Sequence, residues 1–201
     1  MNDKKFIKTK IQNSLKKMLN HRHICGNAFR RLVVLSTMIS GILQESSCRL
    51  PDIARCNCDS KQQASKEKQI SRWLDSRHTS YEVHYLPYVS RLLTHLSKCG
   101  DLVFSIDGST AGLGCMVLMF SVIYKNRAIP VVWHVVKAKK GHLPENTHRE
   151  LLSRLAEICP QDCRVTIVGD GEYDGCDWQE DIKKQGWDYV LRTGEIGRAH
   201  V

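Results

Sequence analysis

Apolar residues recur every three or four positions in the first half of the chain, a period that predicts amphipathic helices. The clearest case is the segment NAFRRLVVLSTMISGIL, whose stripe consists of Phe29, Leu32, Val33, Ser36, Ile39 and Leu43. Further helices are predicted in LPDIARC, in KQQASKEKQISRWLDSR with Ile70, Trp73 and Leu74 facing inward, and from Pro87 to Lys98. Gly100 follows the last of these helices as a stop signal. The first half is therefore predicted to be all-α.

From residue 101 the period becomes that of β-strands. DLVFSID, CMVLMFSVIY and RAIPVVWHVV are apolar runs, and only Lys125 and Asn126 separate the second from the third, which predicts an antiparallel meander. A helix follows in LPENTHRELLSRLAEICP, with Thr147 and Glu150 spaced as a capping box. RVTIVGD and WDYVLRT are the fourth and fifth strands, and the helix GCDWQEDIKKQG lies between them. The predicted order, β-β-β-α-β-α-β, indicates an α/β fold with a single sheet.

Charge divides the chain at about the same place. Residues 1–100 hold 18 Lys and Arg against seven Asp and Glu, a net charge of +11, whereas residues 101–201 have a net charge of −2. We therefore expect a basic helical region at 1–98 that binds double-stranded DNA. Two short helices with the polar turn NCDS between them suit a helix-turn-helix-like grip, with Lys66, Lys68, Arg72 and Arg77 on the outer face. A helical bundle with a solvated basic face is the alternative.

Composition bears on the cellular compartment. The longest apolar stretch, Met116 to Tyr124, is far shorter than the roughly 20 residues that a membrane span needs. The first residues have lysines but no apolar core with a cleavage site, so no secretion signal is expected. The cysteine count is nine, an odd number that favours reduced thiols. We expect a cytoplasmic protein without a membrane partner.

Two aspartates occupy matching places in the predicted sheet. Asp107 and Asp170 each follow an apolar strand and precede a glycine, 63 residues apart. If the first and fourth strands are neighbours, the two carboxylates converge and repel each other unless a divalent cation binds between them. Hard oxygen ligands favour Mg²⁺ or Mn²⁺, and such sites cleave and transfer phosphodiesters.

These motifs resemble a known family. SIDGS on the first strand, YKNRAIPVVW across the second and third, and VGDGEYDG at the end of the fourth are similar to DDE transposases of bacterial insertion sequences, the cut-and-paste group with an RNase H-like core. The resemblance covers about residues 25–194 and is strongest from 102 to 193. It implies that Asp107 and Asp170 are catalytic metal ligands, that Mg²⁺ or Mn²⁺ is the cofactor, and that the partners are transposon-end and target DNA. It also implies a homodimer in the DNA complex and a place near the bacterial nucleoid.

The family's third acid has no counterpart in this sequence. In those transposases it is a glutamate on a helix after the fifth strand, commonly in a tyrosine-arginine-glutamate-lysine signature, which this chain lacks. We therefore expect a partial catalytic core at 101–194, inactive in strand transfer, and a non-native tail at 195–201, since EIGRAHV resembles a sequencing adapter in translation. A non-catalytic DNA-binding fragment that inhibits transposition and an RNase H-like nuclease are the alternatives.

Overall fold

The computed structural model describes residues 3–19, 26–56, 60–138, 145–173 and 175–192. The chain divides into two compact units, Met1–Tyr88 (unit 1) and Val89–Val201 (unit 2). Charge and the stop signal at Gly100 predict a boundary between residues 98 and 101, whereas the division into compact units falls inside a helix that begins at Leu86. The expected tail at 195–201 lies outside the described residues.

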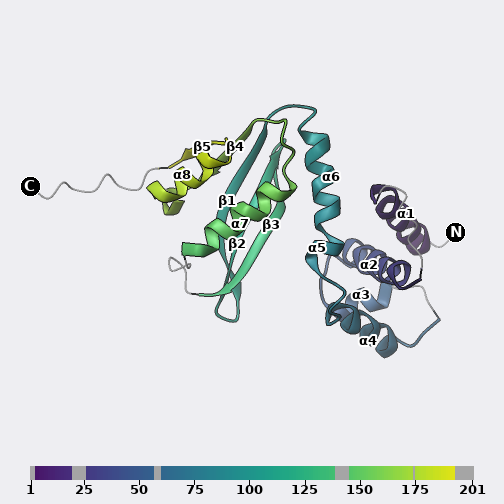
Figure 1. The fold of residues 1–201 in the computed structure, drawn as a ribbon. Helices are drawn as coiled ribbons and strands as arrows, with labels where there is room; N and C mark the ends of the chain where they lie inside the picture. Colours follow the sequence, from purple (N-terminus) through teal and green to yellow (C-terminus); the bar gives the residue numbers. More distant parts are fainter. Residues whose placement is uncertain (1–2, 20–25, 57–59, 139–144, 174, 193–201) are drawn as a thin grey trace, which may run out of the picture. The chain divides into compact units, whose positions relative to one another are not determined.

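Unit 1 is helical, as the apolar period predicts. Its helices are α1 (Asp3–Met18), α2 (Gly26–Glu45), α3 (Leu50–Cys56), α4 (Gln63–Leu74) and α5 (Tyr81–His84), and α6 (Leu86–Leu96) crosses into unit 2 (Figure 1). The predicted helices in the segments now named α2, α3, α4 and α6 are confirmed. Helices α1 and α5 were not anticipated, and neither buries a residue that would mark an apolar stripe.

A small apolar cluster holds α2, α3 and α4 together. Ile53, Ala54 and Ile70 are buried in it, and Met38, Ile42 and Leu50 pack against it. The expectation that Leu74 faces inward is wrong, since this residue is 50 % exposed. The buried face of α4 follows Lys66 and Ile70, which are one helical turn apart, and Leu74 lies at the last residue of the helix, where the apolar cluster no longer reaches it.

Unit 2 contains a five-stranded mixed sheet in the order β3-β2-β1-β4-β5. Its elements are β1 (Leu102–Gly112), β2 (Cys115–Tyr124), β3 (Arg127–Lys137), α7 (Glu145–Ile158), β4 (Val165–Gly169), the short 3₁₀ turn η1 (Gly171–Tyr173), α8 (Cys176–Lys184) and β5 (Asp188–Leu191). β1, β2 and β3 form the antiparallel meander that the sequence predicts, while β4 and β5 run parallel to β1. The predicted order of elements is confirmed.

Three local expectations in unit 2 need correction. β1 does not end at Asp107 but continues to Gly112, because β2 pairs with it from Phe104 to Gly112. Asparagine tolerates positive φ, so Asn126 is the expected residue of this kind in the hairpin between β2 and β3, but the residue with positive φ is Lys125. Thr147 does not cap a helix, since α7 already begins at Glu145 and Thr147 is buried within it.

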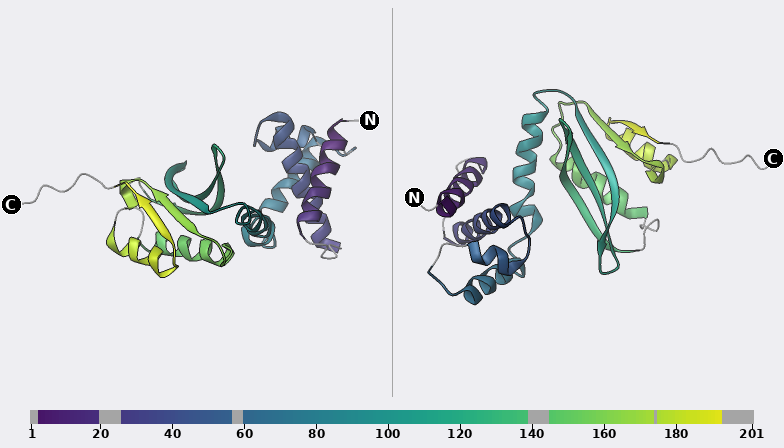
Figure 2. Two further views of the ribbon diagram at one scale, coloured as in Figure 1. Left: turned by 90° about the horizontal axis from the view of Figure 1, so that it is seen from above. Right: turned by 180° about the vertical axis from the view of Figure 1, so that it is seen from behind.

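The two faces of the sheet differ in cover. α7 and α8 lie on the same face (Figure 2), where Phe104, Leu118 and Ile167 are buried with residues of the helices. The alternating residues point to the other face, on which Ile123, Val135 and Val190 are exposed. Among the described helices, none is long and apolar enough to cross a membrane.

Candidate functional site

Asp107 and Asp170 lie at the same level of two neighbouring strands. β1 and β4 are parallel neighbours, and their last pair in register is Ser105 with Val168. Two residues further along each strand bring Asp107 level with Asp170, and adjacent strands lie about 4.8 Å apart. Both residues are exposed. The expected adjacency of the first and fourth strands is therefore confirmed. Asp170 directly follows the last residue of β4, so its level with Asp107 follows only from counting on from the last pair in register.

Tyr173 is buried three residues after Asp170, at the end of the η1 turn. Its ring is 3 % exposed, and its hydroxyl has no hydrogen-bond partner among the described residues. Burial raises the pKa of this phenol, and the carboxylates of Asp170, Glu172 and Asp107 raise it further. Three negative charges from two strands and the η1 turn therefore act on one hydroxyl. No pattern in the sequence identified Tyr173 as part of the site.

Each of the two aspartates is oriented by one hydrogen bond. Ser109 donates its hydroxyl to Oδ2 of Asp107 at 3.0 Å, and the backbone N–H of Glu172 donates to Oδ1 of Asp170 at 3.1 Å. One oxygen of each carboxylate remains for another ligand, and neither carboxylate forms an ion pair with a described residue. Carboxylate oxygens of this kind suit Mg²⁺ or Mn²⁺. The described residues contain no cluster of three or more His, Cys, Asp or Glu that could hold a metal.

Gly169 allows β4 to end in this position. A Cβ atom there would lie 2.9 Å from Ile106 Cγ2 and 3.1 Å from both Leu191 Cδ2 and Tyr173 Cδ2. The absence of a side chain therefore lets the Tyr173 ring pack over the strand end directly before Asp170. The sequence shows the glycine, but only the fold shows which three side chains crowd it.

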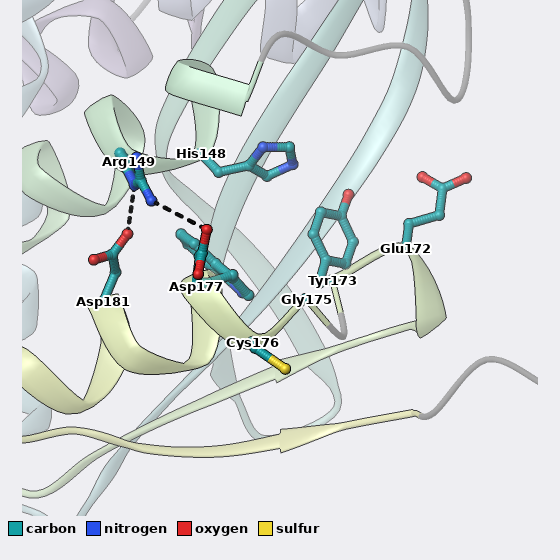
Figure 3. Close-up of a pocket in the computed structure, with 9 residues that line it drawn as sticks. His148, Arg149, Glu172, Tyr173, Gly175, Cys176, Asp177 and Asp181 are labelled. Carbon is teal, nitrogen blue, oxygen red and sulfur yellow. Dashed lines mark hydrogen bonds and ion pairs between the residues drawn. The ribbon is translucent and has the colours of Figure 1, made fainter. Parts of the chain in front are cut away.

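A pocket of about 380 Å³ lies between α7, η1 and α8, and Glu172 and Tyr173 from η1 are among the residues that line it (Figure 3). His148 contacts the Tyr173 ring edge-on at 5.6 Å between centroids and the Trp178 ring at 5.7 Å. Glu172, Asp177 and Asp181 bring three negative charges to the lining against the one positive charge of Arg149. This end of the sheet is therefore acidic and attracts cations.

Arg149 joins the two helices that form this pocket. Its Nε donates to Asp181 Oδ2 at 2.6 Å, and a second nitrogen lies 3.9 Å from Asp177 Oδ2 (Figure 3). Lys184 donates to the other oxygen of Asp181 at 2.9 Å. The hydrogen bonds from Lys184 and Arg149 lower the pKa of Asp181 below its usual value of 3.8. The ionised form of Asp181 thus ties α8 to α7.

A pH dependence of stability follows from this lowered pKa. Because folding favours the ionised form, Asp181 stabilises the protein above pH 3.8, and this contribution is lost as the pH falls through the folded-state pKa. In thermal melts at a series of pH values, the wild type is expected to exceed Asp181→Asn in melting temperature near neutrality, and the gap should close below about pH 4. A gap that stays constant down to pH 2 would contradict this assignment.

The four predicted DNA-binding residues do not all lie on the surface. Lys68, Arg72 and Arg77 are exposed, but Lys66 is only 9 % exposed, so its place on the outer face is a wrong prediction. Lys66 lies one turn before Ile70 on the buried side of α4, because the helical period carries positions 66 and 70 to the same face. Lys68 and Arg72, four residues apart, share the opposite, solvent-facing side.

Lys68 and Arg72 line a groove of about 600 Å³ along α4. Its other lining residues are polar, namely Lys61, Gln62, Ser65 and Gln69. No acidic side chain occurs in this lining, in contrast to the pocket of unit 2. The two units thus carry surfaces of opposite charge, and the cationic one suits a polyanion.

Comparisons with protein-family models and with curated proteins add no evidence about this site. Neither the protein-family models nor the curated proteins yield a match to this chain.

Proposed function

We propose that this chain is part of a DDE-type DNA transposase, in which unit 1 binds DNA and unit 2 carries two of the metal-binding acids. The observation that carries the proposal is the parallel pairing of β1 with β4, with Asp107 in β1 and Asp170 directly after β4, each two residues beyond the last pair in register. These two carboxylates have no cationic partner in the described residues, and their oxygens are the ligands that a divalent cation prefers.

The topology supports an RNase H-like core. Strand order β3-β2-β1-β4-β5, with an antiparallel meander followed by two parallel strands, is the arrangement that such a core requires. It brings the two acids together from the central strand β1 and its neighbour β4. The motifs SIDGS and VGDGEYDG contain these same aspartates.

The residues of the site have distinct tasks in the proposed reaction. Asp107 and Asp170 would hold Mg²⁺ or Mn²⁺ through the oxygens that Ser109 and the Glu172 backbone leave open. A divalent ion bound there supplies charge stabilisation for the entering and leaving oxygens of a phosphodiester. Glu172 orients Asp170 through its backbone, while Arg149 and Asp181 fix the helices behind the site. Lys68, Arg72 and Arg77 would hold the DNA through its phosphates.

Calorimetric titration with Mn²⁺ tests the acid pair. The wild-type chain is expected to bind Mn²⁺, and Asp107→Ala or Asp170→Ala should weaken binding at least about tenfold, because each variant leaves a single carboxylate ligand. Asp101→Ala removes an exposed aspartate next to the start of β1 and serves as the control. Its affinity should match that of the wild type.

Equal Mn²⁺ affinity in all four proteins would show that Asp107 and Asp170 do not form a metal site. The alternative function, a non-catalytic DNA-binding fragment, would then remain. DNA binding measured in the absence of divalent metal would support it. Metal binding lost in both site variants, together with DNA binding that persists, is the result expected for the transposase proposal.

A further inference from the structure

A second cationic cavity lies in unit 1 between α2 and the C-terminal half of α4. It measures about 370 Å³. Arg30 and Arg31 from α2 and Arg72 from α4 line it, and Phe29, Val33 and Trp73 contribute apolar surface. Arg72 also lines the groove along α4, as does Gln69, so the cavity and the groove adjoin at these two residues. A cationic surface therefore extends across two helices.

The positive charge of this surface has no internal compensation. Among the residues that line the cavity or the groove, five are Lys or Arg and none is Asp or Glu. The two acids of this part of α4 have other partners: Glu67 accepts from Gln63 at 3.0 Å and Asp75 from Ser71 at 3.3 Å. None of the five cations forms an ion pair within the described part of the chain. Their mutual repulsion favours a bound anion.

The apolar side of the cavity is rigid. The indole Nε1 of Trp73 donates to the backbone carbonyl of Arg31 at 3.1 Å, which ties α4 to α2. The ring also contacts His84, with 5.2 Å between the centroids. Thr79 lines the cavity too, and its buried hydroxyl has no hydrogen-bond partner among the described residues. The cavity thus offers a fixed aromatic wall, three guanidinium groups and a free hydroxyl.

We propose that this cavity binds one sugar–phosphate unit of duplex DNA, so that unit 1 holds the backbone between α2 and α4. The arginines suit the phosphate oxygens, which guanidinium groups bind in pairs. The wall formed by Phe29, Val33 and Trp73 suits the apolar part of a deoxyribose, a contact that a free phosphate or an acidic side chain cannot make. The next phosphate along the strand reaches Lys68 and Lys61 in the groove. This inference rests on the proposed function only in taking DNA as the partner.

Fluorescence anisotropy of a labelled DNA duplex, titrated with the full chain at several salt concentrations, tests the cavity. Arg30→Gln is expected to weaken binding about tenfold and to reduce the slope of log affinity against log salt by about 0.9, the value for one lost phosphate contact. Arg30→Lys keeps the charge and should restore the slope. Arg49→Gln removes an exposed arginine outside the cavity and the groove, and should leave the slope unchanged.

Competitors identify the source of the phosphate. Unlabelled duplex DNA should displace the probe at far lower concentration than inorganic phosphate, a deoxynucleoside monophosphate or a polyglutamate peptide. Displacement by inorganic phosphate as efficient as by DNA would overturn the assignment to a DNA backbone, and so would a preference for polyglutamate. Stronger competition by duplex RNA than by duplex DNA would overturn it as well.

The outcomes separate this inference from the proposed function. If the wild type binds DNA and Arg30→Gln retains both affinity and slope, the cavity is not a phosphate site, whereas DNA binding and the Mn²⁺ test are unaffected. If Mn²⁺ binding fails but Arg30→Gln reduces the slope, the cavity assignment holds and the catalytic proposal does not. Circular dichroism of each variant shows whether a loss of binding reflects a loss of fold.

Discussion

Replacing Phe104 by alanine is expected to destabilise unit 2 by about 3–5 kcal/mol. Phe104 is fully buried on the helix-covered face of β1, where it is level with Val122 of β2 and Ile167 of β4. The truncation leaves a cavity at the centre of the sheet that its three strands cannot close. Because a domain is typically stable by only about 5–15 kcal/mol, much of the stability of unit 2 would be lost.

Peptide-resolved hydrogen exchange in a urea series measures this loss, because it follows the two units separately. Val103→Ala is the matched control, since Val103 is the neighbouring residue on the opposite face of the same strand and is only partly buried. Its effect should be well under half that of Phe104→Ala. Equal losses from both variants would show that the two faces of the sheet contribute alike, contrary to the burial pattern.

Gly41→Ala is expected to destabilise unit 1 by about 2 kcal/mol, although alanine favours helices by about 1 kcal/mol over glycine. A Cβ atom on Gly41 would lie 2.8 Å from Ile53 Cγ2 and 3.0 Å from the Ile53 Cα atom and carbonyl oxygen. A side chain could rotate away, but the backbone of α3 cannot move without pulling Ile53 out of its apolar cluster. The steric conflict should therefore outweigh the gain in helix propensity.

The same exchange measurement checks this result in peptides from α2 and α3. Asn27→Ala, at an exposed position in the first turn of α2, offers the helix propensity of alanine without a contact to α3. It should be neutral or slightly stabilising. A Gly41→Ala protein as stable as Asn27→Ala would mean that α3 tolerates a shift away from α2.

Local periodicity was sufficient to predict most of the elements. The three- and four-residue spacing of apolar positions predicted α2, α3, α4 and α6, and the apolar runs from residue 101 predicted all five strands in the correct order. These patterns can be recognised in the sequence because each element buries one face. The period of the helix or strand alone sets which residues lie on that face. α1 was missed although Ile7, Ile11, Leu15 and Met18 recur every three or four residues in it; none of these side chains is fully buried.

Which residues of an element are buried, and where the element ends, depended on the elements that pack against it. The pattern in α4 suggested that Leu74 lies inside and Lys66 outside, and the structure has the reverse for both. Lys66, Ile70 and Leu74 share one face of the helix, but the apolar cluster covers this face at Ile70 and does not reach Leu74 at the last residue of α4, while the aliphatic stem of Lys66 is buried on it. Likewise, β1 continues past Asp107 because β2 supplies hydrogen-bond partners as far as Gly112.

The sequence alone determined that two Asp-Gly motifs follow apolar strands and that the basic residues concentrate in the first half of the chain. The adjacency and register of β1 and β4, the packing of Tyr173 over Gly169, and the cavity that Arg30 and Arg31 share with Arg72 all depend on the tertiary structure. The physical reason is how far apart in the sequence the interacting residues lie. The period of a helix or strand arises from residues a few positions apart, whereas residues 42 or 63 positions apart meet only when the burial of several elements together selects their neighbours.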